Sequence, residues 1–209
     1  KVVKKEKDSD RVLEGAVFAL CAKNDITGAD GKVILKADTV IEELATDKEG
    51  KLTFTADLPI GFEYYIKETS PALGFATTDE TQEFTFKYEG AEKEKVSYSF
   101  TFEDEPTVIE ITKTSLTDGK ELEGAKLQVT DESGKVVDSW ISGKEAHIIK
   151  ELVVGQKYTL TETKPADGFV TAESITFTVE DTVEAQKIEM KDDVTTVSYT
   201  HLRAHETSL

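Results

Sequence analysis

Polar and apolar residues alternate in short runs along most of the chain, for example at 83–86, 109–113 and 175–178. A period of two places the apolar side chains on one face of a strand. Turn sequences such as Asp118-Gly119 and Asp167-Gly168 separate the runs, and no segment keeps a 3.6-residue apolar period for more than two turns. The pattern predicts an all-β fold of short antiparallel strands packed as β-sandwiches.

The chain also contains an internal repeat. Two groups of residues recur, each with the same internal spacing. The first group is Leu13, Gly15 and Ala16, which recurs as Leu122, Gly124 and Ala125. The second is Leu58, Gly61, Tyr64 and Glu68, which recurs as Leu152, Gly155, Tyr158 and Glu162. This repeat predicts two copies of one domain, at 1–106 and 107–193, joined by a linker of a few residues. We expect 194–209 to lie outside the fold, as a non-native tail or the start of a truncated further repeat.

The first copy is longer than the second. Gly15 and Leu58 are 43 positions apart, whereas Gly124 and Leu152 are 28 apart. We place the additional residues within about 24–48, where an Asp-Gly turn is followed by two apolar runs. An added hairpin is therefore predicted there.

Strand parity directs one ionisable side chain per strand toward the core. In 109–113 the face that carries Ile109 and Ile111 continues to Lys113. The side chains placed inward in the same way are Lys4, Glu68 and Asp104 in the first copy and Glu162 and Asp192 in the second. A strand that simply ends in solvent is the alternative for any one of them, but six such placements weaken it. The neighbours Lys5 and Asp193 leave two of these positions open to a shift of one residue.

Buried charges must be paired or neutralised. Desolvation lowers the pKa of a lysine and raises the pKa of a carboxyl group, so a buried lysine can become a neutral nucleophilic amine. A protonated glutamic acid can polarise an aspartate carboxyl group and carry the proton. Condensation of the amine with the carboxyl group forms an amide, releases water and removes both charges from the core.

The motif Lys-x10-Gly-Ala followed by Leu-x2-Gly-x2-Tyr-x3-Glu-Thr-x4-Gly-Phe resembles the Cna protein B-type domain of Gram-positive surface proteins and pilins. The likeness covers about 2–193, and the second copy is especially similar to the fibronectin-binding-protein domain behind the SpyCatcher ligation pair. The resemblance implies two tandem immunoglobulin-like or transthyretin-like β-sandwiches, each with a spontaneous isopeptide bond. The implied cross-linked residues are Lys4 with Asp104 and Lys113 with Asp192, and the implied catalytic residues are Glu68 and Glu162. Many members use Asn as the acceptor, whereas both copies here have Asp, so water would leave instead of ammonia.

Composition narrows the function classes. The formal net charge of −17 disfavours binding to nucleic acid or to an anionic membrane surface. No apolar run reaches the roughly 18 residues of a membrane helix. The start lacks a basic-then-apolar pattern, so we expect no signal peptide there. The single cysteine, Cys21, excludes an intramolecular disulfide, and two of the three histidines lie in the last nine residues. We therefore expect neither a cofactor nor a metal site.

Three functions remain. The leading prediction is a pair of structural stalk modules from a cell-wall-anchored adhesin or pilin on a Gram-positive surface, whose partners are neighbouring domains of the same protein. The alternative is an adhesin module that binds a host matrix protein or glycan. An enzyme of transthyretin-like fold ranks last, because the chain lacks a Ser/His/Asp order and a His-rich pocket. Amide formation happens once within each domain, so the chain is not predicted to be an enzyme.

Overall fold

The computed structural model describes residues 1–87 and 96–195, and within these ranges every regular element is a strand. The predicted all-β class is confirmed. Strand pairing groups the described strands into two units, the first from Val2–Glu6 to Phe100–Asp104 and the second from Val108–Ser115 to Gln186–Asp192. In the described part of the chain no helix is long and apolar enough to cross a membrane.

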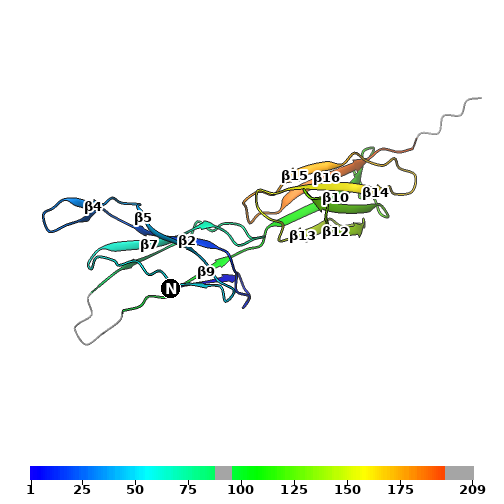
Figure 1. Cartoon of the computed structure of the whole chain (residues 1–209). Coiled ribbons are helices and arrows are strands. Elements are labelled where there is room, and N and C mark those ends of the chain that lie inside the picture. Colours follow the sequence, from blue (N-terminus) through cyan, green and yellow to red (C-terminus); the bar gives the residue numbers. More distant parts are fainter. Residues whose placement is uncertain (88–95, 196–209) are drawn as a thin grey trace, which may run out of the picture. The chain divides into compact units, whose positions relative to one another are not determined.

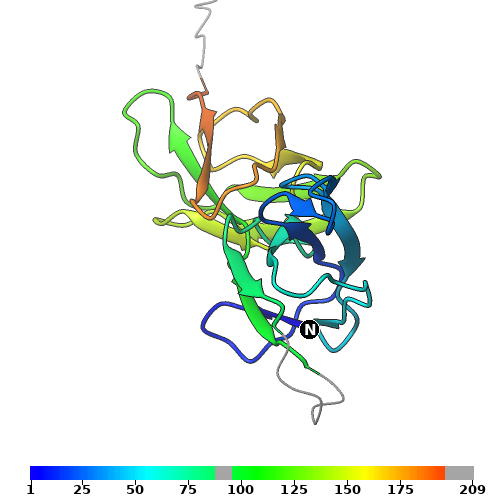
Figure 2. The same cartoon turned by 90° about the vertical axis from the view of Figure 1, so that its left-hand side faces the viewer.

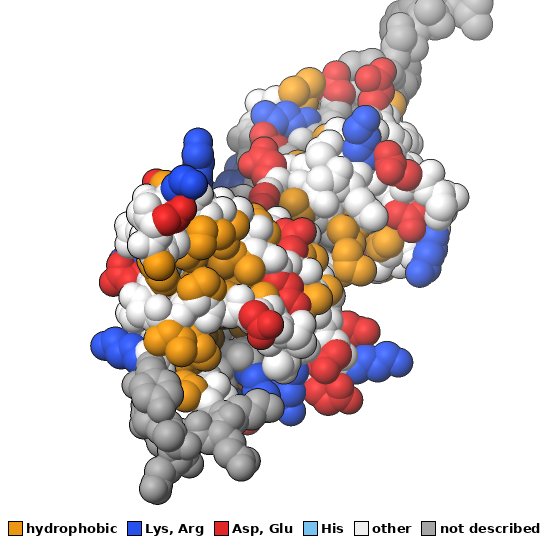
Figure 3. Space-filling view, turned by 60° about the vertical axis from the view of Figure 1, so that its left-hand side comes forward, with side chains coloured by type: hydrophobic (Ala, Val, Ile, Leu, Met, Phe, Trp, Pro, Cys, Tyr) orange, Lys and Arg blue, Asp and Glu red, His pale blue; other side chains and the backbone are white. Residues whose placement is uncertain are grey.

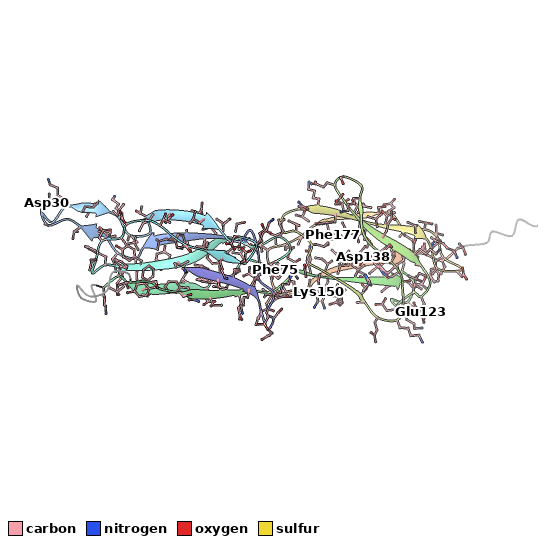
Figure 4. The ribbon with its side chains drawn as sticks, turned by 60° about the horizontal axis from the view of Figure 1, so that its bottom comes forward. Asp30, Phe75, Glu123, Asp138, Lys150 and Phe177 are labelled. Carbon is pink, nitrogen blue, oxygen red and sulfur yellow. The ribbon has the colours of Figure 1, made fainter. Side chains whose placement is uncertain are left out.

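Two sheets and a small hairpin make up the first unit (Figures 1 and 2). Its strands are β1 (Val2–Glu6), β2 (Val17–Ala22), β3 (Ile26–Thr27), β4 (Val33–Leu35), β5 (Val40–Ala45), β6 (Lys51–Leu52), β7 (Glu63–Ser70), β8 (Thr81–Thr85) and β9 (Phe100–Asp104). One sheet has the order β5-β2-β7-β8 and the other β6-β1-β9. The hairpin β3–β4 lies inside the interval predicted for the additional residues, and Asp30 marks its outer end (Figure 4).

The second unit repeats this arrangement. Its strands are β10 (Val108–Ser115), β11 (Lys126–Asp131), β12 (Val136–Ile141), β13 (His147–Lys150), β14 (Lys157–Lys164), β15 (Ile175–Thr178) and β16 (Gln186–Asp192). One sheet has the order β12-β11-β14-β15 and the other β13-β10-β16. In both units the strand that starts the repeat is therefore the central strand of the smaller sheet.

Not every pairing in the first unit is antiparallel. β1 and β9, the first and last strands of the first unit, are parallel neighbours, with Val2 opposite Phe100 and Lys4 opposite Phe102. Parallel neighbours need a long crossover connection, and here the rest of the unit supplies it. The two ends of the unit thus meet inside one sheet.

The Gly-Ala motif holds the start of β2 and β11 in place. Gly15 and Gly124 have positive φ angles of 85° and 93°, a conformation that favours glycine. The amide that follows each glycine donates to a buried hydroxyl oxygen, from Ala16 to Thr46 Oγ1 (3.1 Å) and from Ala125 to Ser142 Oγ (3.0 Å). The repeated motif is therefore a turn that sets where the next strand begins.

Hydrogen bonds to the second unit continue two residues past the predicted boundary at 193. The amide of Thr195 donates to the Gly168 carbonyl at 2.9 Å, and its hydroxyl donates to the same oxygen at 2.9 Å. Thr107 makes the equivalent two bonds to Gly74 in the first unit, at 3.0 and 3.3 Å. Val194 and Thr195 thus belong to the second unit, and the rest of the predicted tail, 196–209, lies outside the described residues.

Candidate functional site

Lys4 and Asp104 meet in the core of the first unit. Parity turns both side chains inward, and both are buried, at 0% and 2% exposure. Lys4 lies opposite Phe102, so Asp104 is two residues further along β9, a step of roughly 6.6 Å in strand rise. The long lysine side chain spans this step, and its Nζ contacts Asp104 Oδ1 directly.

Glu68 reaches the same point from the opposite sheet. It lies on β7, continues the buried face of Tyr64 and Ile66, and its Oε1 is 3.0 Å from Lys4 Nζ. Its other oxygen, Oε2, accepts a hydrogen bond of 3.0 Å from the Thr78 amide. The carboxylate is therefore held from behind while one oxygen faces the amine.

The second unit has the same arrangement on equivalent strands. Lys113 on β10 contacts Asp192 Oδ1 on β16, and its Nζ lies 3.1 Å from Glu162 Oε1 on β14. Glu162 Oε2 accepts a hydrogen bond of 2.8 Å from the Ala172 amide. The structure thus brings all six predicted side chains together, as two sets of three.

The two positions left open by one residue are resolved by burial. Lys5 has a side chain that is 33% exposed and lies 3.6 Å from Asp10 Oδ1 on the surface. Asp193 is exposed, whereas Asp192 is fully buried. Lys4, and not Lys5, therefore belongs to the first set. Asp192, and not Asp193, belongs to the second.

Burial favours the uncharged form of Glu68, Asp104 and Asp192. Desolvation raises the pKa of Glu68 to about 7; the charge of Asp104 acts in the same direction, while the Thr78 amide and Lys4 oppose it. Desolvation is also the largest cause that raises the pKa values of Asp104 and Asp192. A pKa in this range lets Glu68 both accept and return a proton near neutral pH.

Each set leaves two carboxyl oxygens without a hydrogen bond. These buried atoms are Glu68 Oε1, Asp104 Oδ2, Glu162 Oε1 and Asp192 Oδ2. Each glutamate Oε1 is nevertheless ion-paired with the lysine Nζ of its set, at 3.0 and 3.1 Å. A glutamic acid proton shared with the aspartate oxygen would satisfy both carboxyl groups and would activate the aspartate carbon toward the amine. The amine and both carboxyl groups of each set therefore lie together in the core.

Sequence reasoning missed the backbone groups that orient the glutamates. The Thr78 and Ala172 amides each follow their glutamate by ten positions, so the repeat spacing could have revealed them. Sequence reasoning also missed a difference between the side chains that surround the two lysines. Lys4 Nζ lies 5.3 Å from the centroid of the Phe18 ring. In the second unit the position equivalent to Phe18 is occupied by Leu127. The first site is therefore the more aromatic of the two.

Another surface feature lies away from Lys4 and Lys113. A groove of about 430 Å³ in the first unit is lined partly by aromatic side chains, and apolar side chains gather on this unit in Figure 3. The aromatic members are Phe54, Phe84, Phe86, Tyr98 and Phe100. None of the six side chains lines this groove. Among the described residues, no group of three or more His, Cys, Asp or Glu side chains could hold a metal ion.

Comparison with protein families gives a match over most of the chain. The model for the SpaA prealbumin-like fold domain matches residues 1–100 and again 107–194. The second segment contains a complete set of lysine, aspartate and glutamate, and the first contains Lys4 and Glu68, with Asp104 just beyond its end. No curated protein matches the chain.

Three solved structures are similar to the chain, and the first of them, with a TM-score above 0.5, shows the same fold. The Bacillus anthracis TIE protein is 24% identical over 92% of this chain with a TM-score of 0.52, and this chain spans 33% of its length. The shaft pilin SpaA of Lactobacillus rhamnosus GG, as its D295N mutant, is 17% identical, with a TM-score of 0.38 and coverage of 94% of this chain and 98% of the pilin. The pilus adhesin SpaC of the same organism is 15% identical, with a TM-score of 0.46 and coverage of 96% and 32%.

Proposed function

Because the chain belongs to the SpaA family of prealbumin-like fold domains, we propose that it forms two structural modules of a Gram-positive surface adhesin or pilin, each locked by an autocatalytic Lys–Asp isopeptide bond. The observation that carries the proposal is the direct contact of a buried lysine with a buried aspartate, repeated in both units. A glutamate oxygen without a hydrogen bond faces each contact.

The reaction moves two protons from the lysine nitrogen to one oxygen of the aspartate. Glu68 accepts the first proton from the Lys4 ammonium group, the neutral Nζ attacks Cγ of Asp104, and the C–N bond forms while Glu68 passes this proton to a carboxyl oxygen of Asp104. Glu68 then relays the second proton from the nitrogen to the same oxygen, the C–O bond breaks, water departs, and Glu68 is ionised again. The amine and the carboxyl group are already in contact, which supplies a high effective concentration.

The second unit follows the same course with its own residues. Lys113 supplies the amine, Asp192 supplies the carboxyl carbon, and Glu162 carries the proton. Each site reacts once, because its lysine and aspartate are consumed in the bond, so the chain performs no turnover.

The bond links the first and last strands of each unit, and this gives it a mechanical role. Force applied at the two ends of the first unit enters at β1 and leaves at β9, which are neighbours in one sheet. A covalent link from Lys4 to Asp104, which are 100 positions apart, carries this force past the segment between them. On the model used for disulfides, closing a loop of this size also stabilises the folded state by about 4.7 kcal/mol.

The proposed location is the extracellular surface of a Gram-positive cell, where such modules separate an adhesive tip from the wall. The partners are then neighbouring domains of the same protein. The net charge of −17 agrees with a stalk that remains solvated and does not bind nucleic acid.

Single-molecule extension of the chain tests this role. We expect the parent to resist extension of both units, because the segments between the cross-linked residues cannot be pulled out. Lys113→Ala should release the second unit alone and add its contour length to the trace. Full extension of both units in the parent would contradict the proposal.

A further inference from the structure

β12 forms an exposed apolar edge of the second unit. It is the last strand in the order β12-β11-β14-β15, and among the described residues no strand pairs with its outer side. Three of its apolar side chains, Val136, Val137 and Ile141, are 48%, 39% and 63% exposed. An edge of this kind presents unpaired backbone groups and is a template for another strand.

The equivalent edge of the first unit is protected by charge. β5 pairs with β2 as β12 pairs with β11, and each pairing has a register shift near the same point. Leu44 lies opposite Phe18 and Trp140 opposite Leu127, which makes Glu43 the counterpart of Ser139. The register shift is shared, so it does not distinguish the two edges. The difference is that β5 has an exposed acid where β12 has a serine.

The sequence of β12 is complementary to itself in an antiparallel pairing centred on Ser139. Opposite residues must share a face of the sheet, so Ser139 meets the serine of the other copy, and Asp138 meets Trp140. Val137 then meets Ile141, which places two apolar pairs around the centre. No like charges stand opposite each other. In the same pairing of β5, Glu43 would face Glu43 of the other copy.

We propose that β12 is a self-association surface, through which a second copy of this chain continues the four-stranded sheet by antiparallel pairing about Ser139. Such a contact is isologous, because the same strand contributes both sides and the twofold axis closes the assembly. Asp138 lies on this strand (Figure 4), and its carboxylate accepts the Ser139 amide at 2.7 Å in the free edge. Association exchanges this local bond for a bond to the partner strand.

Variants that place a negative or a positive charge at Ser139 test the proposal. Sedimentation equilibrium of the full chain, up to about 1 mM, should show a monomer–dimer equilibrium. Ser139→Glu and Ser139→Lys should each raise the dissociation constant by roughly two- to fivefold, because the introduced charge faces its own copy. An equimolar mixture of the two variants should recover or exceed the affinity of the parent. Thr176→Glu, on β15 at the opposite edge of the same sheet, is the matched control and should behave as the parent.

Ser139 and Thr176 are both exposed, so each variant should fold. Thermal melting of each variant checks this. A strictly monomeric parent over the whole concentration range would overturn the proposal. So would a dimer that Thr176→Glu weakens as strongly as Ser139→Glu, since the contact would then lie elsewhere. A mixture of the two Ser139 variants that associates no better than either alone would exclude a twofold axis at this residue.

Discussion

Lys4 Nζ and Glu68 Oε1 lie 3.0 Å apart on opposing sheets, and the glutamate oxygen has no hydrogen bond there. At this distance the glutamate oxygen is ion-paired with the ammonium group and can accept its proton. The equivalent atoms of Lys113 and Glu162 are 3.1 Å apart and form the same ion pair. The repetition of this unusual feature is the basis for the predictions on cross-linking.

Intact mass is expected to fall below the sequence mass by two waters. Each condensation removes one water, and both units have a buried lysine in contact with an aspartate. Electrospray mass spectrometry of the denatured chain measures the deficit, and fragmentation of digested peptides locates it. A folded sample with the full sequence mass would contradict cross-linking in both units.

Glu162→Ala is expected to leave the second unit folded but without its cross-link. The glutamate takes no part in the bond, but without it the Lys113 proton has no acceptor. The variant should lie only one water below its own sequence mass, whereas the parent lies two waters below. It should also melt at a lower temperature than the parent. Glu132→Ala, in the exposed turn between β11 and β12, is the control and should keep both bonds. Complete cross-linking of Glu162→Ala would assign the proton transfer to another group.

Lys4→Ala and Lys5→Ala are expected to differ strongly although the residues are adjacent. Removal of Lys4 abolishes one bond and leaves Glu68 and Asp104 buried without a cation, a loss of about 3–5 kcal/mol in the free energy of unfolding. Lys5 is partly exposed, so its removal should change this energy by about 0.5 kcal/mol or less. Denaturant unfolding and intact mass together test the pair. Equal behaviour of the two variants would show that the lysine was misassigned.

Cross-linking of the first unit is expected to speed up as the pH rises toward about 7, the raised pKa of Glu68. Below this pH Glu68 already holds a proton, so it cannot deprotonate the Lys4 amine. Above it the ionised carboxylate can accept the proton from Lys4, and the amine becomes nucleophilic. The rate should rise about tenfold per pH unit below 7 and then level off.

The measurement uses newly synthesised chain that is quenched in denaturant and refolded by dilution at each pH. Digestion and mass spectrometry then follow the peptide that joins Lys4 to Asp104. Glu68→Gln is the control and should react slowly with no step near pH 7. A rate for the parent that falls between pH 6 and 7.5 would reverse the assigned direction of proton transfer.

Truncation after Asp193 is expected to destabilise the second unit, whereas truncation after Thr195 is not. Thr195 donates two hydrogen bonds to the Gly168 carbonyl, and their loss should cost about 1–3 kcal/mol. Differential scanning calorimetry of the two truncated chains against the full chain gives the comparison. Equal melting temperatures for all three would place Val194 and Thr195 outside the folded unit.

The sequence alone was sufficient for the fold class, the repeat and the six inward side chains. Alternation is a local property, so parity carried from Ile109 and Ile111 to Lys113 without knowledge of the partner strands. The same argument placed Glu162 and Asp192 on buried faces, and the structure buries both. Repetition in two copies then distinguished this pattern from the ordinary ending of strands.

The tertiary structure decided what depends on which strands become neighbours. Parity cannot reveal that β1 and β9 are parallel, because the direction of pairing follows from the path of the whole unit. Nor could it separate Lys4 from Lys5, since the start of a short strand is uncertain by a residue and burial comes from the opposing sheet. The amides of Thr78 and Ala172 have no side-chain signature, and only the folded loops bring them to the glutamates. Contacts between strands that are distant in the sequence depend on how the sheets pack. Which side chains of a strand face the core depends only on the local alternation of polar and apolar residues.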